Sequence, residues 1–148
     1  MRESRTVPGR SRRGRRGGAM MEMALLMPWV FLLFIGIVDW GFYAYSLISV
    51  QAAIRTAVLY TSTSDTTKAD SSTACTLVLA ELSKLPNMSG VTDCTSNPVV
   101  TATAVTGPDS NAASQVSVQY QSISLIPIPG LLTKQFTITR SGKMRLRG

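Results

Sequence analysis

A single glutamate, Glu22, stands at the start of a long apolar stretch that runs from Met23 to Val38. A carboxylate at the edge of hydrocarbon costs about 2.5–3.5 kcal/mol on insertion scales, so an acidic residue in this place usually has a partner or a function. The chemistry that Glu22 offers is therefore the recognition of a positive charge at a membrane. A lone glutamate at the start of a membrane-length apolar stretch is typical of a structural protein that is processed and assembled at the membrane, and not of an enzyme.

Further groups that could support catalysis are few. The chain has no histidine, which removes the commonest general base and metal ligand. The acids that follow the apolar stretch share no spacing; they are Asp65, Asp70, Glu81, Asp93 and Asp109. No glycine-rich phosphate loop and no nucleophile motif is present. We expect no catalytic activity, no cofactor and no metal site.

The two cysteines, Cys75 and Cys94, both follow the apolar stretch. If the N-terminus is cytoplasmic, both lie in the translocated part of the chain, where an oxidising compartment lets them pair. A disulfide across a loop of this length stabilises the fold by about 3 kcal/mol in the chain-entropy model. Metal binding is the alternative, but two cysteines without histidine cannot complete the usual four-ligand zinc site. We predict a disulfide.

The positive charge of the chain is concentrated at its N-terminus. The formal net charge is +7, and residues 1–17 contribute +6 of it through seven arginines and one glutamate. Because the remainder is nearly neutral, we expect no nucleic-acid partner. A basic cluster directly before an apolar helix instead predicts an N-terminus that stays in the cytoplasm.

The apolar stretch has the properties of a membrane-spanning helix. It continues past Asp39 through Trp40 and Tyr43 to the roughly 20 residues that a bilayer requires. Trp40, Tyr43 and Tyr45 stand where an aromatic belt meets the outer interface. Pro28 is tolerated in a membrane helix and predicts a kink. A signal peptide fits less well, because its apolar region usually has about 7–15 residues and ends in a small-residue cleavage site.

The helical pattern continues beyond the membrane segment. An apolar stripe recurs at spacings of three and four, comprising Trp40, Tyr43, Leu47, Val50, Ile54 and Ala57, whereas Ser46, Ser49, Arg55 and Thr56 fall largely outside it. We predict one helix from about Ala19 to Tyr60, roughly 60 Å long. Residues 1–17 would form a basic cytoplasmic leader, residues 18–45 the transmembrane helix and residues 46–60 its exposed continuation. The later part of the stripe is expected to pack on the protein's own domain.

Residues 61–148 are expected to form a small α+β domain outside the membrane. A Ser/Thr/Asp-rich linker covers 61–73, and Ser71, Ser72 or Thr73 would cap a short helix from Ala74 to Leu85. The period then changes to two, which predicts three antiparallel strands, at 99–105, 116–120 and 136–139. A turn at 107–111 separates the first two. The second connection, 126–132, is apolar and either covers the edge of the core or presents a contact surface.

Three segments together resemble a known family. They are Gly17-Gly-Ala-Met-Met-Glu-Met-Ala-Leu-Leu-Met-Pro28, Gly36-Ile-Val-Asp-Trp-Gly41 and Gln51-Ala-Ala-Ile-Arg-Thr-Ala57. They resemble the TadE-like minor pilins (pseudopilins) of tight-adherence pilus systems, and the tail with Gln115–Tyr120 and Met144-Arg145 is loosely similar to the C-terminal strands of that family. The resemblance implies a structural role in pilus assembly in the inner membrane, together with other minor pilins, the major pilin and an assembly platform.

The resemblance also implies processing by a prepilin peptidase at the cytoplasmic face. A cut between Gly17 and Gly18 makes Glu22 the fifth residue of the mature chain, and a cut after Gly18 makes it the fourth; we favour the first. Cleavage removes the basic leader and exposes a new α-amine, which Glu22 of a neighbouring subunit could attract in the membrane. The alternatives are that Glu22 only reaches the lipid headgroups, that the chain is an uncleaved envelope anchor whose domain binds a partner, or that the domain is a tethered enzyme or ligand-binding module.

Overall fold

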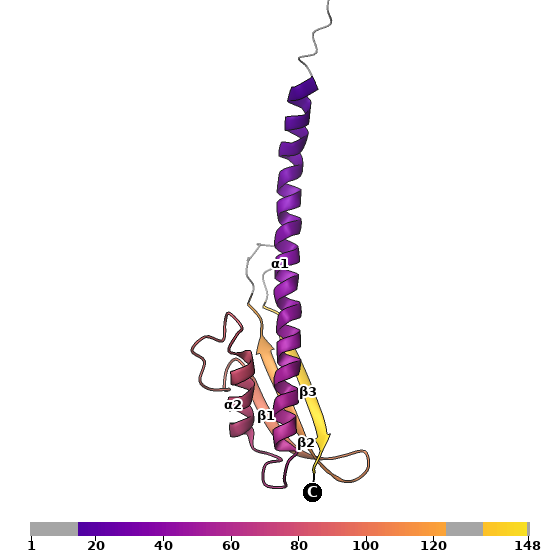
Figure 1. Ribbon diagram of the computed structural model, residues 1–148, viewed down its shortest axis with the longest axis vertical. Helices are drawn as coiled ribbons and strands as arrows, with labels where there is room; N and C mark the ends of the chain where they lie inside the picture. Colours follow the sequence, from indigo (N-terminus) through magenta and orange to yellow (C-terminus); the bar gives the residue numbers. More distant parts are fainter. Residues whose placement is uncertain (1–14, 124–134, 148) are drawn as a thin grey trace, which may run out of the picture. The chain divides into compact units, whose positions relative to one another are not determined.

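The computed structural model describes residues 15–123 and 135–147, with side chains from residue 18 onward. The elements follow in the order α1 (Arg15–Thr61), α2 (Ser71–Leu82), β1 (Val99–Thr106), β2 (Ala112–Gln121) and β3 (Thr137–Arg145) (Figure 1). The chain divides into two compact units, Met1–Val38 and Asp39–Gly148. The predicted α+β class, with a long N-terminal helix, a short second helix and a three-stranded antiparallel sheet, is confirmed.

Helix α1 is longer than predicted at its start. It begins at Arg15, four residues before Ala19, and ends at Thr61. Pro28 lies inside the helix without ending it. The ring removes one backbone hydrogen bond, a loss that a long helix tolerates because the surrounding turns keep theirs. The predicted continuity from the apolar stretch into the exposed half is therefore confirmed.

The three strands form one antiparallel sheet in the order β1-β2-β3, with β2 in the centre. Val100 pairs with Val118 across β1 and β2, and Tyr120 pairs with Ile138 across β2 and β3. The predicted turn between β1 and β2 is confirmed. It is closed by the backbone N–H of Gly107, which donates to the carbonyl of Asn111 at 2.7 Å. Ser110 in this turn has a positive φ of 61°, which a short polar residue can adopt.

One face of the sheet packs with α1 and α2 to form the core of the second unit (Figure 1). The buried apolar side chains include Val50, Ala53, Ala57, Val78, Leu82, Val116, Val118 and Tyr120. Gly142 of β3 is required by this packing, because a Cβ there would lie 2.6 Å from Cγ2 of Ile54 and 3.2 Å from Cγ2 of Val58. The sheet therefore approaches α1 closely at Gly142, where β3 carries no side chain.

Several predicted boundaries were wrong. Helix α2 begins at Ser71 and ends at Leu82, whereas we expected Ala74 and Leu85. Strand β3 extends to Arg145, well past the expected end. Ser46, which falls outside the predicted stripe, is buried, and its hydroxyl is satisfied by the carbonyl of Phe42, to which it donates at 2.9 Å. Trp40, which precedes the part of the stripe expected to pack on the domain, is 73% exposed. The apolar segment 126–132 lies outside the described residues.

The N-cap of α2 is Asp70, one residue before the three candidates that the sequence suggested. Its carboxylate accepts hydrogen bonds from the backbone N–H groups of Ser72 and Thr73, both at 3.1 Å. Hydrogen bonds from Thr73 and Ser72 hold the pKa of Asp70 well below its usual value. The ionised carboxylate of Asp70 therefore caps α2 and fixes its first residue.

This cap predicts an acid dependence of stability. Because the pKa of Asp70 is lower in the folded chain than in the unfolded chain, its stabilisation is present above about pH 4 and is lost as the pH falls further. Thermal unfolding of the detergent-solubilised protein should show a larger fall in Tm between pH 5 and pH 3 than that of Asp70→Asn, which can cap without titrating in this range. Equal losses in the two proteins would contradict the assignment.

Candidate functional site

The part of α1 from Gly18 to Val38, called here the anchor segment, is apolar, and none of its side chains is buried. The helix is long and apolar enough to cross a membrane between Gly18 and Thr61, and none of its most apolar window is buried. The exposed residues include Leu25, Trp29, Phe31, Leu33, Phe34 and Ile37. Such a surface is not stable in water, so the segment indicates a membrane anchor.

Glu22 lies near the start of this anchor and is exposed. It is the only charged residue between Gly18 and Val38. Among the residues that the structure describes, none forms a salt bridge with Glu22. A carboxylate in this environment can bind a positively charged group from outside the chain.

The bond between Gly17 and Gly18 lies within the first turns of α1. The first four N–H groups of a helix have no partner within it, so this end unwinds more easily than the interior. Gly18 has no atom within 4 Å of the position of a Cβ. Cleavage at this bond, and the roles of Gly17, Gly18 and Glu22, stay predictions.

In the second unit, α1 has a buried and an exposed side. The buried side includes Val50, Ala53 and Ala57, which contribute to the core. On the other side lies an exposed stripe, which consists of Tyr45, Ile48, Ala52, Arg55 and Leu59. At about 100° per residue, the centre of this stripe lies opposite the centre of the buried side. The exposed stripe keeps the spacing of three and four that is typical of helix–helix contacts.

The C-terminal end of α1 is held by a network of buried polar groups. The hydroxyl of Ser114 lies 2.8 Å from both Oγ1 of Thr61 and the carbonyl oxygen of Lys68. The backbone N–H of Arg147 donates to the carbonyl of Ser62 at 2.9 Å. These contacts join the helix end to β2 and to the chain after β3. These hydrogen bonds fix the register of α1 on the sheet, and with it the side that carries the exposed stripe.

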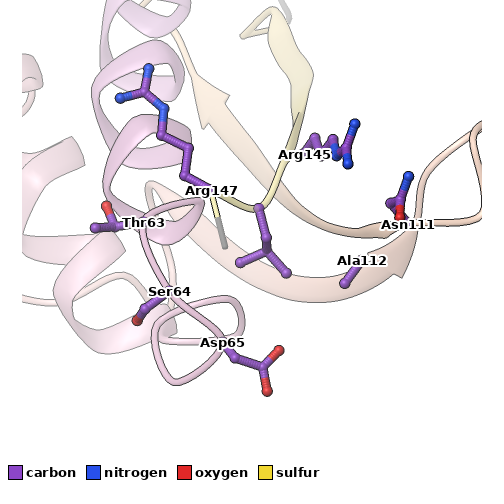
Figure 2. A pocket seen from close by; sticks show the side chains of 8 residues that line it. Thr63, Ser64, Asp65, Asn111, Ala112, Arg145 and Arg147 are labelled. Carbon is purple, nitrogen blue, oxygen red and sulfur yellow. The ribbon is translucent and has the colours of Figure 1, made fainter.

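A polar cavity of about 710 Å³ lies next to this helix end (Figure 2). It is lined by Thr63, Ser64, Asp65, Asn111, Ala112, Arg145, Leu146 and Arg147. Nη1 of Arg145 lies 3.3 Å from Oδ2 of Asp109, so this guanidinium is already paired. Arg147 is held at the end of α1 by its backbone N–H, which donates to the carbonyl of Ser62.

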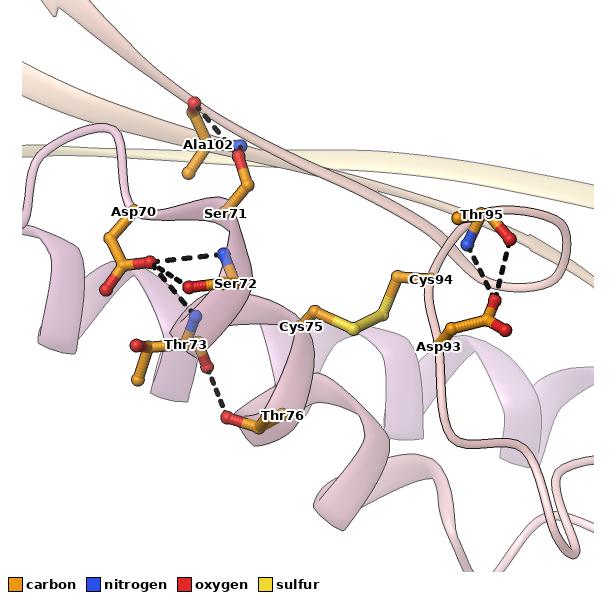
Figure 3. Close-up of a disulfide and its surroundings, with 10 residues drawn as sticks. All are labelled: Asp70, Ser71, Ser72, Thr73, Cys75, Thr76, Asp93, Cys94, Thr95 and Ala102. Carbon is orange, nitrogen blue, oxygen red and sulfur yellow. Dashed lines mark hydrogen bonds between the residues drawn. A yellow bond between two sulfur atoms is a disulfide. The ribbon is translucent and has the colours of Figure 1, made fainter.

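Cys75 in α2 and Cys94 in the segment before β1 form a disulfide, with their Cα atoms 5.9 Å apart (Figure 3). Both partners are fixed locally. Cys75 follows the Asp70 cap, and Cys94 follows Asp93, whose carboxylate accepts from the N–H and hydroxyl of Thr95 at 3.1 and 2.7 Å. Among the described residues, no three groups of the kind that bind metals lie together.

Removal of the disulfide by Cys75→Ser and Cys94→Ser together should lower the free energy of unfolding by about 3 kcal/mol, because the unfolded chain regains the freedom of the closed loop. Chemical denaturation of the detergent-solubilised double variant checks this value. Secondary structure measured by circular dichroism should stay native in the absence of denaturant. A change below about 1 kcal/mol would contradict the expectation.

Sequence reasoning did not find two groups of exposed residues. The exposed stripe was hidden by the more regular apolar pattern of the buried side, although its spacing of three and four was visible. The sequence predicts Phe136 as the first residue of a strand, but it precedes β3 and is 49% exposed. Its ring lies 5.3 Å from that of Tyr43, a contact that no local pattern reveals.

The comparisons with known proteins agree with the resemblance in the sequence. Residues 17–59 match the family model described as TadE-like protein. This range includes Gly17, Gly18, Glu22 and the whole exposed stripe, and it ends before α2. No curated protein and no solved structure matches the chain. The TadE-like match over the N-terminal helix indicates a protein associated with the tight-adherence pilus.

Proposed function

We propose that this chain is a minor pilin-like (pseudopilin-like) structural subunit, which helps to assemble a tight-adherence pilus. The TadE-like match covers the helix that this role requires. The anchor segment would hold the subunit in the inner membrane before assembly, with the leader in the cytoplasm and the second unit outside. The subunit has no catalytic role in this proposal; its function is to pack.

The observation that carries the proposal is the exposed stripe on α1. A helix that only supported its own domain would be polar on the side away from the sheet. Here Ile48 is 66% exposed, and Tyr45 and Leu59 are 45% and 44% exposed. With Ala52 between them, these side chains form a surface that a second helix can cover. Helices of neighbouring pilin-like subunits are the partners that we propose for it.

Processing completes the proposed mechanism. A prepilin peptidase would cut between Gly17 and Gly18 and remove the leader with its charge of +6. The leader otherwise keeps the N-terminus at the cytoplasmic face, because arginines do not cross the hydrocarbon. After cleavage, the α-amine of Gly18 in one subunit would pair with Glu22 of another. The pair would lower the cost of keeping both charges in lipid while the helices pack side by side.

An uncleaved anchor with a partner-binding domain is the second candidate. It would also need a membrane helix, and its domain would use a surface of the second unit. It gives no reason for the exposed stripe on α1, which is apolar at every position except Arg55. The presence of that stripe favours the subunit.

The proposal predicts that Ile48→Glu removes the protein from assembled pili. A charge at the centre of the exposed stripe would be buried without a partner when helices pack, which costs several kcal/mol. Its amount in sheared pili, measured by quantitative mass spectrometry, should fall at least about tenfold, the equivalent of 1.4 kcal/mol. Ala80→Glu in α2, which is also an exposed helix position, is the matched control and should be incorporated normally.

Ile48→Glu should fold as the unaltered protein does, because exposed substitutions usually change stability by less than about 0.5 kcal/mol. Normal incorporation of Ile48→Glu would overturn the proposed packing surface. An equal loss for Ile48→Glu and Ala80→Glu would also count against it, since any added charge would then have the same effect.

A further inference from the structure

We infer that the second unit touches the membrane itself, through an aromatic patch that consists of Trp40, Tyr43 and Phe136. The partner is the headgroup region of the outer face of the membrane that the anchor segment crosses. The inference depends on α1 being a membrane anchor, which is part of the proposed function. It adds a lipid contact at Phe136, which directly precedes β3, to the contacts made by the helix.

The three rings of the aromatic patch are in contact. The ring centroids of Trp40 and Tyr43 lie 6.0 Å apart in an edge-to-face arrangement. Those of Tyr43 and Phe136 lie 5.3 Å apart, with an interplanar angle of 56°. Phe136 immediately precedes β3, so the contact joins the start of that strand to α1 (Figure 1). The patch is held together by aromatic packing, yet Trp40 and Phe136 keep 73% and 49% of their surface exposed.

The position of Tyr43 in the chain sets the level of the patch. A bilayer needs about 20 helical residues, and counted from Met23 they end near Phe42 and Tyr43. Trp and Tyr are enriched at the boundary between hydrocarbon and headgroups. Because the ring of Phe136 contacts that of Tyr43, the start of β3 is expected at the same boundary.

On the β3 side of the patch, the charge suits an anionic lipid surface. From Ser110 to the C-terminus, the chain has no aspartate or glutamate, and the carboxylate next to the patch is that of Asp39 on α1. The residues next to Phe136 are Gln135 and Thr137, both uncharged, and Lys134 and Arg140 are the nearest cations in the sequence. No carboxylate of the chain after Ser110 would therefore repel lipid phosphates, and these cations would attract them.

The patch is also distinct from the surface that we assign to neighbouring subunits. Trp40 and Tyr43 belong to the side of α1 that continues into the core, whereas the exposed stripe lies on the opposite side. A helix that packs on Ile48 would thus leave Phe136 uncovered. Lipid contact and subunit packing can be tested with separate variants.

The test places one tryptophan at the patch in the full-length chain. Trp29→Phe and Trp40→Phe remove both native tryptophans, and Phe136→Trp then supplies a single fluorescent probe. The protein is reconstituted at low density in vesicles of phosphatidylethanolamine and phosphatidylglycerol, with and without lipids brominated near the headgroup. Thr103→Trp, at an exposed position of β1, is the matched control. Gln135→Trp provides a second probe that leaves the ring of Phe136 in place.

We expect the probes at 136 and 135 to emit at shorter wavelength than the probe at 103. The brominated lipid should quench them several-fold more strongly. Quenching at 136 and 135 no stronger than at 103 would overturn the inference. A blue shift that appears only at high protein density, without lipid quenching, would show that a second copy covers the patch and would also overturn it. Neither result depends on cleavage or on incorporation into pili, so failure here is distinguishable from failure of the proposed function.

Discussion

Glu22→Ala is expected to lower incorporation of this subunit into pili about tenfold or more while leaving its insertion into the membrane intact. Insertion depends on the apolar stretch, which the substitution makes more apolar. Assembly depends on a partner for the new α-amine, which alanine cannot supply. If the ion pair offsets about half of the roughly 2.5–3.5 kcal/mol that a charged group costs in lipid, the α-amine left unpaired in the alanine variant lowers incorporation about tenfold or more.

The variants Glu22→Asp and Glu22→Gln separate charge from shape. Aspartate keeps the carboxylate and should retain part of the incorporation, whereas glutamine keeps the length and should fail as alanine does. The amount in sheared pili relative to the amount in the membrane is the measurement. If the alanine variant is incorporated normally, Glu22 only reaches the headgroups and has no role in assembly.

Tyr120→Ala is expected to have the largest effect on stability, with a loss of about 3–5 kcal/mol, as is typical when a large buried aromatic side chain is removed. Tyr120 is 1% exposed and lies near the end of β2, the central strand of the sheet. Its hydroxyl donates to Oδ1 of Asn87, and Nδ2 of Asn87 donates to the carbonyl of Gln121 at 2.9 Å. The side chain thus fills the core and fixes the segment that follows α2.

Tyr120→Phe separates these two contributions. It keeps the ring and removes only the hydrogen bond, so it should cost about 0.5–1.5 kcal/mol. Chemical denaturation of the detergent-solubilised proteins, followed by circular dichroism, measures both values. A loss below about 1 kcal/mol for Tyr120→Ala would show that Tyr120 is not a central part of the core.

The elements with a strong local pattern could be predicted from the sequence. The long helix follows from an apolar stretch that continues as a stripe with Val50, Ile54 and Ala57, all of which are buried. The turn at 107–111 follows from its Gly, Pro, Asp and Asn residues. These patterns depend on neighbours in the chain, which is why the fold class could be predicted from residue types alone.

Predictions failed where distant residues decide the structure. The part of β3 from Arg140 to Arg145 does not alternate between apolar and polar residues, and its pairing with β2 defines it as a strand. Gly142, which usually weakens a strand, is accommodated there because α1 passes too close for a side chain. The start of α2 was misplaced because serine and threonine are also good caps, and only the hydrogen bonds of Asp70 decide between them.

The candidate site divides in the same way. Glu22 and the glycine pair were visible in the sequence because a charge and two small residues stand out next to an apolar stretch. The exposed stripe needed the fold, since burial on the sheet decides which of two apolar sides stays uncovered. The contact between Tyr43 and Phe136 could be found only in the folded structure, because the two residues are far apart in the chain.

Removal of the basic leader is the step on which subunit packing in this account depends. The most direct measurement is the intact mass, with N-terminal fragmentation, of the protein isolated from the membranes and pili of cells that make it. We predict a chain that begins at Gly18, with Glu22 as its fifth residue. A chain in assembled pili that still carries the leader, residues 1–17, would contradict the account. In that case no free α-amine would stand near the carboxylate of Glu22.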